Sequence, residues 1–235
     1  GYMFFAAGLG AYNSSIFHLM THGFFKALLF LSAGSVIHAM HHEQDMRKMG
    51  GLFKKIPFTG SMMWIGSLSI IGFPYFSGYY SKESILENAY FASSLMANFA
   101  YFVGILTALL TAFYSWRLLF LTFHGTNRSE PKYYSEAHES PLVMTLPLFL
   151  LAIGSIFAGT FFSEYYIGKF QDVFWNNAII IHSHSHNYLP FIQTLIIKSS
   201  VALGILLAAI LYFYNKNIAS TLSKNFKTLY LISLN

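Results

Sequence analysis

The stretch His18-Leu-Met-Thr-His22-Gly-Phe-Phe-Lys26-Ala-Leu-Leu-Phe-Leu31 decides the fold class, because it places three ionisable side chains inside an otherwise apolar run. His18, His22 and Lys26 are spaced i, i+4, i+8. In an α-helix they follow one face, drifting by about 40° and rising by about 6 Å at each step. A lysine at the centre of a membrane helix costs about 2.5 kcal/mol or more, so it should face a protein interior or a water-filled cavity. We expect a functional polar stripe on a membrane-spanning helix. The alternative is a lysine that only packs helices together.

The composition of the whole chain agrees with a membrane protein. Of 235 residues, 55% are hydrophobic and only 10% are charged, and the mean hydropathy is +0.49. These values are too apolar for an ordinary soluble domain. The formal net charge of +5 comes from Lys and Arg scattered between apolar runs instead of one basic face, so we expect a lipid bilayer and no nucleic acid as a partner. The chain has no cysteine, which excludes disulfides and thiolate metal sites.

The apolar runs predict an all-α integral membrane protein. We expect a bundle of about five full transmembrane helices and one truncated helix at residues 1–11. The full helices are predicted near residues 14–38, 56–81, 98–123, 141–162 and 191–214. Because the chain opens inside an apolar run without an initiator methionine, we also expect it to be a piece of a longer protein.

One of these helices should be broken. The run from residue 56 to residue 81 contains Gly72, Pro74 and Gly78, and proline removes an amide donor while glycine loosens the backbone. Lys82 and Glu83 follow directly. Discontinuous helices at membrane depth need protein or water to satisfy their freed backbone groups, and in transporters they often mark the ion path. We therefore expect an ion site at Lys82, with Glu83 as an accessory residue. A proline kink with a lysine that extends to the surface is the alternative.

The distribution of basic residues predicts the topology. The segments 41–57, 124–140 and 215–235 hold four, two and three Lys or Arg, whereas the segments 83–97 and 163–189 hold none and one. By the positive-inside rule the first three face the cytoplasm or matrix. Lys198 should then lie close enough to the outer surface to extend to it, and we expect no transport role for it.

Other motifs carry little chemistry. His182, His184 and His186 alternate with serines and suggest a metal site. No cysteine and no fourth ligand at a typical spacing accompany them, so a solvated outer loop is the better interpretation and we expect no metal. The chain has no Walker sequence, dinucleotide fingerprint or Gly-x-Ser-x-Gly elbow, so we expect no cofactor-binding and no catalytic redox residues.

A line of titratable groups at membrane depth remains, and it favours proton transfer. It consists of His18, His22, Lys26 and Lys82, with His38 as a further accessory candidate. Neutral lysine accepts a proton and charged lysine donates one, and its long stem can move between partners.

Several segments closely resemble one family. They are residues 18–39, 43–52, Ile65-Gly-Ser-Leu68, Gly72-Phe-Pro74, Gly78-Tyr-Tyr-Ser-Lys82, Ser115–Gly125 and Ala137–Pro141. The chain resembles the chain 5 (bacterial chain L) subunits of respiratory complex I, the NADH:ubiquinone oxidoreductase. By that resemblance Lys26 matches the central-axis lysine, His18 and His22 match the adjacent histidines, and Lys82 matches the lysine of the broken helix that leads to the exit half-channel.

The resemblance implies a proton-translocating subunit without redox chemistry of its own. FMN, iron–sulfur clusters, NADH and quinone would belong to partner subunits, and the partners would be other membrane-arm subunits and the bilayer. Residues 1–162 would form the C-terminal half of the antiporter-like core, and residues 163–235 an outer loop, an additional helix and an inner tail. We expect a bacterial inner membrane, with the mitochondrial inner membrane as the alternative. An Mrp-type cation/proton antiporter subunit and a non-conducting scaffold remain open.

Overall fold

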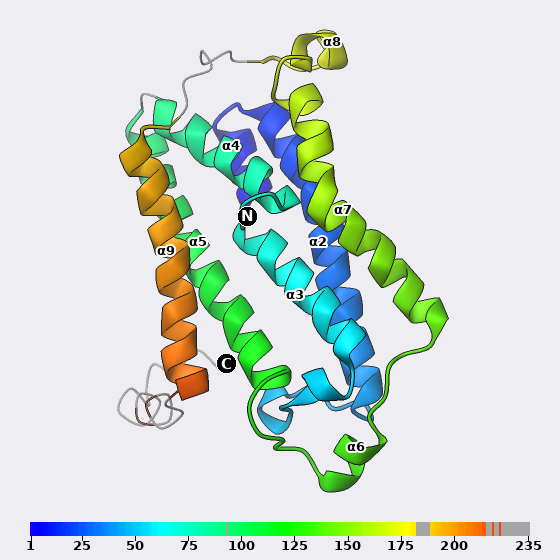
Figure 1. The fold of residues 1–235 in the computed structure, drawn as a ribbon. Coiled ribbons are helices and arrows are strands. Elements are labelled where there is room, and N and C mark those ends of the chain that lie inside the picture. The colour runs from blue at the N-terminus through cyan, green and yellow to red at the C-terminus, as the bar shows by residue number, and fades with distance from the viewer. Residues whose placement is uncertain (93, 182–188, 215–217, 219–220, 222–235) are drawn as a thin grey trace.

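The computed structural model describes residues 1–92, 94–181, 189–214, 218 and 221. These residues form helices and connecting turns, and no strand occurs among them. Figure 1 shows long helices side by side, with α6 at one end of the bundle and α8 at the other. The helices are α1 (Tyr2–Gly8), α2 (Tyr12–Ala39), η1 (Met46–Lys48), η2 (Leu52–Lys54), α3 (Pro57–Ile71), α4 (Ser77–Phe91), α5 (Leu95–Thr122), α6 (Pro131–Glu136), α7 (Leu142–Tyr166), α8 (Gln171–Trp175), α9 (Phe191–Ala209) and η3 (Ile210–Tyr214).

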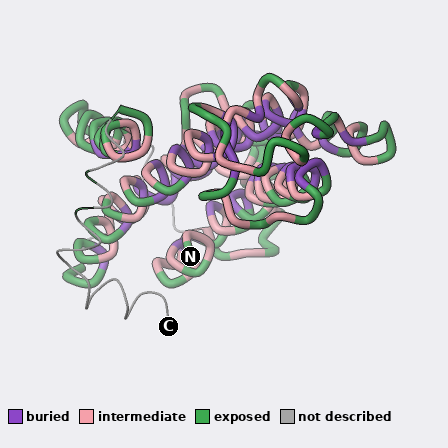
Figure 2. Tube along the Cα trace, turned by 90° about the horizontal axis from the view of Figure 1, so that it is seen from below, coloured by how far each residue is buried: buried purple, intermediate pink, exposed green. Residues whose placement is uncertain are grey.

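The predicted all-α membrane fold is confirmed. Within the described residues, four helices are long and apolar enough to cross a membrane, namely α2, α5, α7 and α9 together with η3. The fifth predicted span is the broken one, divided into α3 and α4, and the expected truncated helix is α1. Figure 2 shows that exposed residues follow the outer sides of the helices. On α5 these include Phe99, Phe102 and Leu106, as a lipid-facing surface requires.

Helix α2 lies at the centre of one group of helices, and α5 forms a pair with α9. Contacts join α2 with α1, α3, α4 and α7, and α5 also touches α3 and α4. Because α2 is in contact on several sides, the polar face predicted for it lies against other helices instead of lipid.

The predicted helix break lies between α3 and α4. Gly72 ends α3 in the left-handed conformation with φ of 78°, and the amide of Phe73 donates to the carbonyl of Leu68 at 3.0 Å. Pro74 follows, and Tyr75 also has a positive φ of 71°. Gly78 lies so close to the Ser69 carbonyl that a Cβ would collide with it. Gly72 and Gly78 therefore shape the break for separate reasons, and Pro74 lies within it.

Two serines tie this break to α7. The Ser77 hydroxyl donates to the Gly154 carbonyl at 2.7 Å and accepts from the Gly159 amide at 3.1 Å. The Ser69 hydroxyl donates to the Ser155 carbonyl at 3.0 Å. It also accepts from the Gly78 amide at 3.3 Å. Protein groups thus replace hydrogen bonds lost at the break, as a discontinuous membrane helix requires.

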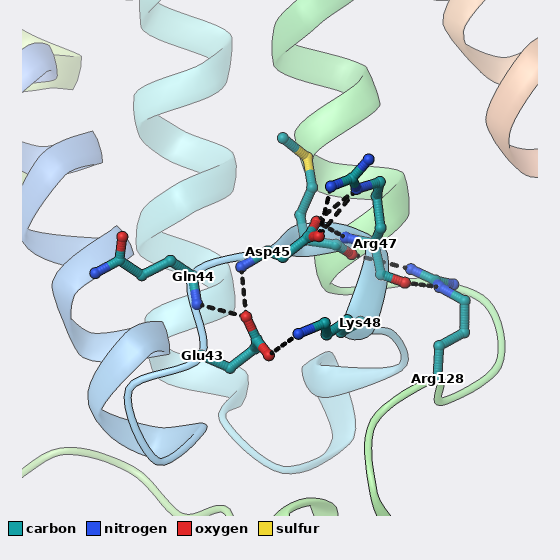
Figure 3. Close-up of polar contacts among 7 residues, drawn as sticks. Glu43, Gln44, Asp45, Arg47, Lys48 and Arg128 are labelled. Carbon is teal, nitrogen blue, oxygen red and sulfur yellow. Dashed lines mark hydrogen bonds and ion pairs between the residues drawn. The ribbon is translucent and has the colours of Figure 1, made fainter. Parts of the chain in front are cut away.

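The connections after α2 and after α5 are locked together at the end of the bundle that holds α6. Arg128 donates to the carbonyls of Arg47 at 3.0 Å and Met46 at 3.3 Å (Figure 3). It also donates to the Leu121 carbonyl at 2.6 Å. In the same figure Glu43 binds Lys48 at 2.9 Å, and Asp45 binds Arg47. The predicted grouping of segments 41–57 and 124–140 at one end agrees with these contacts.

A carboxylate from a distant segment caps α3. Glu139 accepts from the amides of Phe58 at 2.6 Å and Thr59 at 3.1 Å, and from the Thr59 hydroxyl at 2.7 Å. These are among the amides that a helix N-terminus leaves without an intrahelical partner, and a negative charge there also complements the helix dipole. The segment before α7 thereby fixes the start of α3.

Candidate functional site

The polar stripe of α2 exists in the structure. The ring centroids of His18 and His22 lie 5.7 Å apart, and Phe25 contacts both rings at 6.2 Å and 5.3 Å. His18 is buried, with 3% of its surface exposed, whereas His22 and Lys26 are half-buried. The three residues therefore lie in a row, from a fully enclosed imidazole to an amine with more space around it.

Helix α4 meets this stripe with a row of hydroxyls. His18 Nδ1 lies 2.9 Å from the Ser81 Oγ, and the Thr21 hydroxyl donates to the same oxygen at 2.8 Å. One turn along, the hydroxyls of Ser14 and Ser84 lie 2.6 Å apart. The interface between α2 and α4 is thus held by hydrogen bonds as well as by packing.

Lys82 follows Ser81 and lies inside the protein. Only 7% of its surface is exposed, and its Nζ has no hydrogen-bond partner among the described residues. The Nζ lies 5.1 Å from the ring centre of Tyr2, whose hydroxyl donates to the Gly104 carbonyl at 2.7 Å. The alternative of a lysine extending to the surface is therefore wrong for Lys82.

Lys82 lines a cavity of about 290 Å³ between α4, α5 and α9. Glu83, Pro74 and Tyr79 border the same space. The exposed Lys198 of α9 also reaches this cavity, with its Nζ 5.7 Å from the ring centre of Tyr79. Its exposure agrees with the expectation from the sequence, which did not indicate its position beside the cavity.

A second cavity, of about 170 Å³, borders Lys26 between α2, α3 and α5. Its polar wall is formed by Ser67, Tyr114 and Ser115, and Lys26 Nζ lies 5.9 Å from the ring centre of Phe30. The two lysines line different cavities. A proton moving between them would need other groups or water as a bridge.

His38 does not join this arrangement. It lies exposed in the last turn of α2, about three turns beyond Lys26, toward the end that holds α6. Glu83, the other accessory candidate, lies in the cavity wall beside Lys82. The His182–His186 stretch, for which we expected no metal, lies outside the described residues.

Sequence reasoning missed the hydroxyl row, although a signal was present. Ser14, His18 and Thr21 are spaced i, i+4, i+7, and Ser81, Ser84 and Asn88 are spaced i, i+3, i+7. Both spacings place small polar side chains on one helix face. Two such faces in apolar helices predict helices that meet through hydrogen bonds.

This arrangement is suited to moving protons. Imidazoles, hydroxyls and amines can each both accept and donate a proton. The unpartnered amine of Lys82 faces a space large enough to hold water, and a buried polar group without a protein partner is a position where an ordered water is expected.

Comparisons with known proteins agree with one another. Residues 1–111 match the family model for the transmembrane part of NADH:quinone oxidoreductases and Mrp antiporters. The chain is 54% identical over 181 residues to NADH-ubiquinone oxidoreductase chain 5 of Marchantia polymorpha, covering 77% of this chain and 27% of that protein. It is 50% identical to NADH-quinone oxidoreductase subunit L of Rhodobacter capsulatus, covering 79% and 27%.

A sea-anemone relative extends this likeness along the chain. Chain 5 of Metridium senile is 49% identical over 221 residues, covering 93% of this chain and 34% of that protein. The chain therefore spans about a quarter to a third of the length of these curated relatives. The likeness reaches beyond the residues matched by the family model and includes the later helices.

Proposed function

We propose that this chain, which belongs to the family of NADH-ubiquinone oxidoreductase chain 5 and NADH-quinone oxidoreductase subunit L, forms part of a proton path in the membrane arm of that enzyme. Its apolar helices and its relatives place it in an inner membrane. The chain would contribute proton transfer to the complex, whereas quinone reduction and its cofactors would reside in partner subunits.

The observation that carries this proposal is the buried amine of Lys82, which lies beside a cavity and has no hydrogen-bond partner among the described residues. Protons would pass along Lys26, His22 and His18 and reach Lys82, with waters bridging the gaps. Burial of an amine without a counter-ion is unfavourable for packing alone, so such a lysine in a membrane protein is by default a functional residue.

Two other functions remain to be compared with this one. The family model includes Mrp antiporters, so a cation/proton exchange role is the first alternative. It is less favoured, because the curated relatives named above carry complex I names over 77% to 93% of this chain. The second alternative is a membrane scaffold in which Lys26 and Lys82 only hold helices together. The lack of a described partner for Lys82 argues against that role.

A substitution series at Lys26 in the complete complex tests the proposal. Lys26→Ala should remove most of the proton translocation per NADH oxidised in membrane vesicles, while the assembled complex remains detectable on native gels. Lys26→Arg should rescue poorly, because arginine does not release its proton at physiological pH. Lys132→Ala, which changes an exposed lysine in the connection before α7, should leave translocation unchanged. Full translocation in Lys26→Ala with less assembled complex would establish the scaffold role instead.

A further inference from the structure

The hydroxyl of Ser81 has a definite direction in the hydrogen-bond network around His18. The single hydroxyl hydrogen of Thr21 has two acceptors within reach, the Ser81 Oγ at 2.8 Å and the His18 carbonyl oxygen at 3.2 Å, and we assign it to Ser81, the closer of the two. Ser81 also lies 2.9 Å from His18 Nδ1. No other hydrogen-bond partner of the Ser81 side chain occurs within the described part of the chain, so its own hydrogen is available only to His18.

This order of donors assigns the proton on His18. Because Ser81 accepts from Thr21 and donates to His18, Nδ1 must act as the acceptor. Neutral imidazole carries one N–H, which therefore lies on Nε2. The alternative tautomer would make Ser81 accept two hydrogen bonds and leave its hydroxyl hydrogen without a partner in a site where His18, Thr21 and Ser81 are all buried.

We propose that Ser81, oriented by Thr21, is a positioning residue that fixes the tautomer and ring orientation of His18 for proton transfer through Nε2. This inference rests on the proposed function and adds a residue to it. Ser81 does not itself carry the proton in this scheme. It holds the acceptor nitrogen of His18, as the orienting partner of a catalytic imidazole does.

The position of Ser81 in the sequence gives it a second effect. It precedes Lys82 directly on α4, so the bond that orients His18 also fixes the helix that carries the lysine. The titratable side chains facing His18 are Tyr2 from α1, His22 from α2 and Lys82 from α4. A disturbance of Ser81 should therefore change how this group responds to pH, as well as its geometry.

The chain offers a matched control on the same helix. Ser84 lies one turn from Ser81, is also buried, and also bonds to α2, but its partner there is the hydroxyl of Ser14 at 2.6 Å instead of a titratable ring. Ser84→Ala removes a comparable buried hydrogen bond between α2 and α4. It leaves His18 and its partners unchanged.

The test measures proton translocation per NADH oxidised, as a function of pH, in vesicles that contain the complete complex. Ser81→Ala should lower translocation about three- to tenfold and displace its pH optimum by about half a unit or more. Ser81→Thr, which keeps the hydroxyl, should restore both quantities to within about twofold and a few tenths of a unit. Thr21→Val should give the same displacement with a smaller loss, and Ser84→Ala should leave the pH optimum in place.

Equal effects of Ser81→Ala and Ser84→Ala, or a loss in Ser81→Ala without displacement of the pH optimum, would reduce Ser81 to a packing residue and overturn the inference. Lys26→Ala, measured in the same vesicles, separates this result from failure of the proposed function. If Lys26→Ala abolishes translocation while the two serine variants behave alike, only the positioning role is wrong. If Lys26→Ala translocates normally, the proton path itself is wrong.

Discussion

An amine at membrane depth needs either a partner or a space that holds water. Lys26 and Lys82 each border a cavity of their own. Neither forms an ion pair with an acidic side chain of the described residues. A neutralising carboxylate would hold the proton on each lysine and reduce its ability to release it. The lack of such a pair among the described residues favours transfer of the proton over its permanent retention on the lysine.

A comparison of Lys82 with Lys198 should show whether proton translocation needs a buried lysine or any lysine that lines the cavity. Both residues border the 290 Å³ cavity, but Lys82 is buried and Lys198 is exposed on α9. Lys82→Met should lower translocation as much as Lys26→Ala or somewhat less, because the only buried amine beside that cavity among the described residues is lost. Lys198→Met should translocate within about twofold of the unchanged complex. Proton translocation per NADH oxidised is the measurement, and a larger loss in Lys198→Met would move the path toward α9.

Asp45 should make the connection after α2 sensitive to strong acid. Its hydrogen bonds with Arg47 lower the pKa of the Asp45 carboxyl to about 2. A carboxyl with a lowered pKa stabilises the folded connection above its unfolded pKa, near 4, and loses this contribution as the pH falls through 2. Cleavage of residues 41–56 by pepsin, an acid protease, should therefore increase between about pH 4 and pH 2 in vesicles exposing this connection.

Asp45→Asn is the control for the change in cleavage between pH 4 and pH 2. It should be cleaved at pH 4 as readily as at pH 2, once the activity of pepsin at each pH has been corrected with an unrelated substrate. An unchanged ratio between the two pH values in the unmodified protein would show that Asp45 does not hold this connection.

At the scale of elements, the break between α3 and α4 could be predicted from the local sequence, whereas the contacts that attach these helices to the rest of the bundle could not. Gly72, Pro74 and Gly78 predicted the break because backbone conformation depends on the residues themselves. Nothing in the local sequence indicated that Glu139 would cap α3, since the two segments are 80 residues apart and the contact depends on how α7 packs. The row formed by Ser81 and its neighbours is intermediate, because its spacing was visible but its partner helix was not.

The cap of α3 can be tested directly. Glu139→Ala removes a carboxylate that accepts from two backbone amides and one hydroxyl, and it should destabilise α3 by about 1–2 kcal/mol. The thermal midpoint of complex disassembly should fall. Glu136→Ala, which removes only a half-exposed contact with His41, should change that midpoint less. Equal midpoints for the two variants would show that Glu139 is replaceable by water.

At the scale of the whole molecule, the bundle has two chemically different ends. The end that holds α6 carries Lys54, Lys132 and the Arg128 contacts, and the opposite end carries α8 (Figure 1). The bundle was predictable from the apolar runs, whereas its orientation in the membrane stays a prediction from the distribution of charge. The site was predictable only as far as individual ionisable residues, because cavities and hydrogen-bond directions arise from packing between distant helices.

Single cysteines test this orientation, since the chain contains none of its own. Lys54→Cys and Lys132→Cys place a cysteine at exposed positions at one end of the bundle. Lys169→Cys places one at an exposed position beside α8. A membrane-impermeant maleimide should label the first two from the cytoplasmic or matrix side and the third from the opposite side. Labelling of all three from one side would overturn the assigned topology.

The two serines at the helix break limit how α4 can move relative to α3 and α7. A hinge at Gly72–Gly78 would swing α4 only after three hydrogen bonds had separated, namely the two between Ser77 and α7 and the one between the Gly78 amide and Ser69. These bonds oppose a separate movement of α4 and favour its movement together with α7. Under the proposed function, gating would then fall to lysine stems, hydroxyl rotors and bridging waters, whose reorientation needs no rearrangement of the helices.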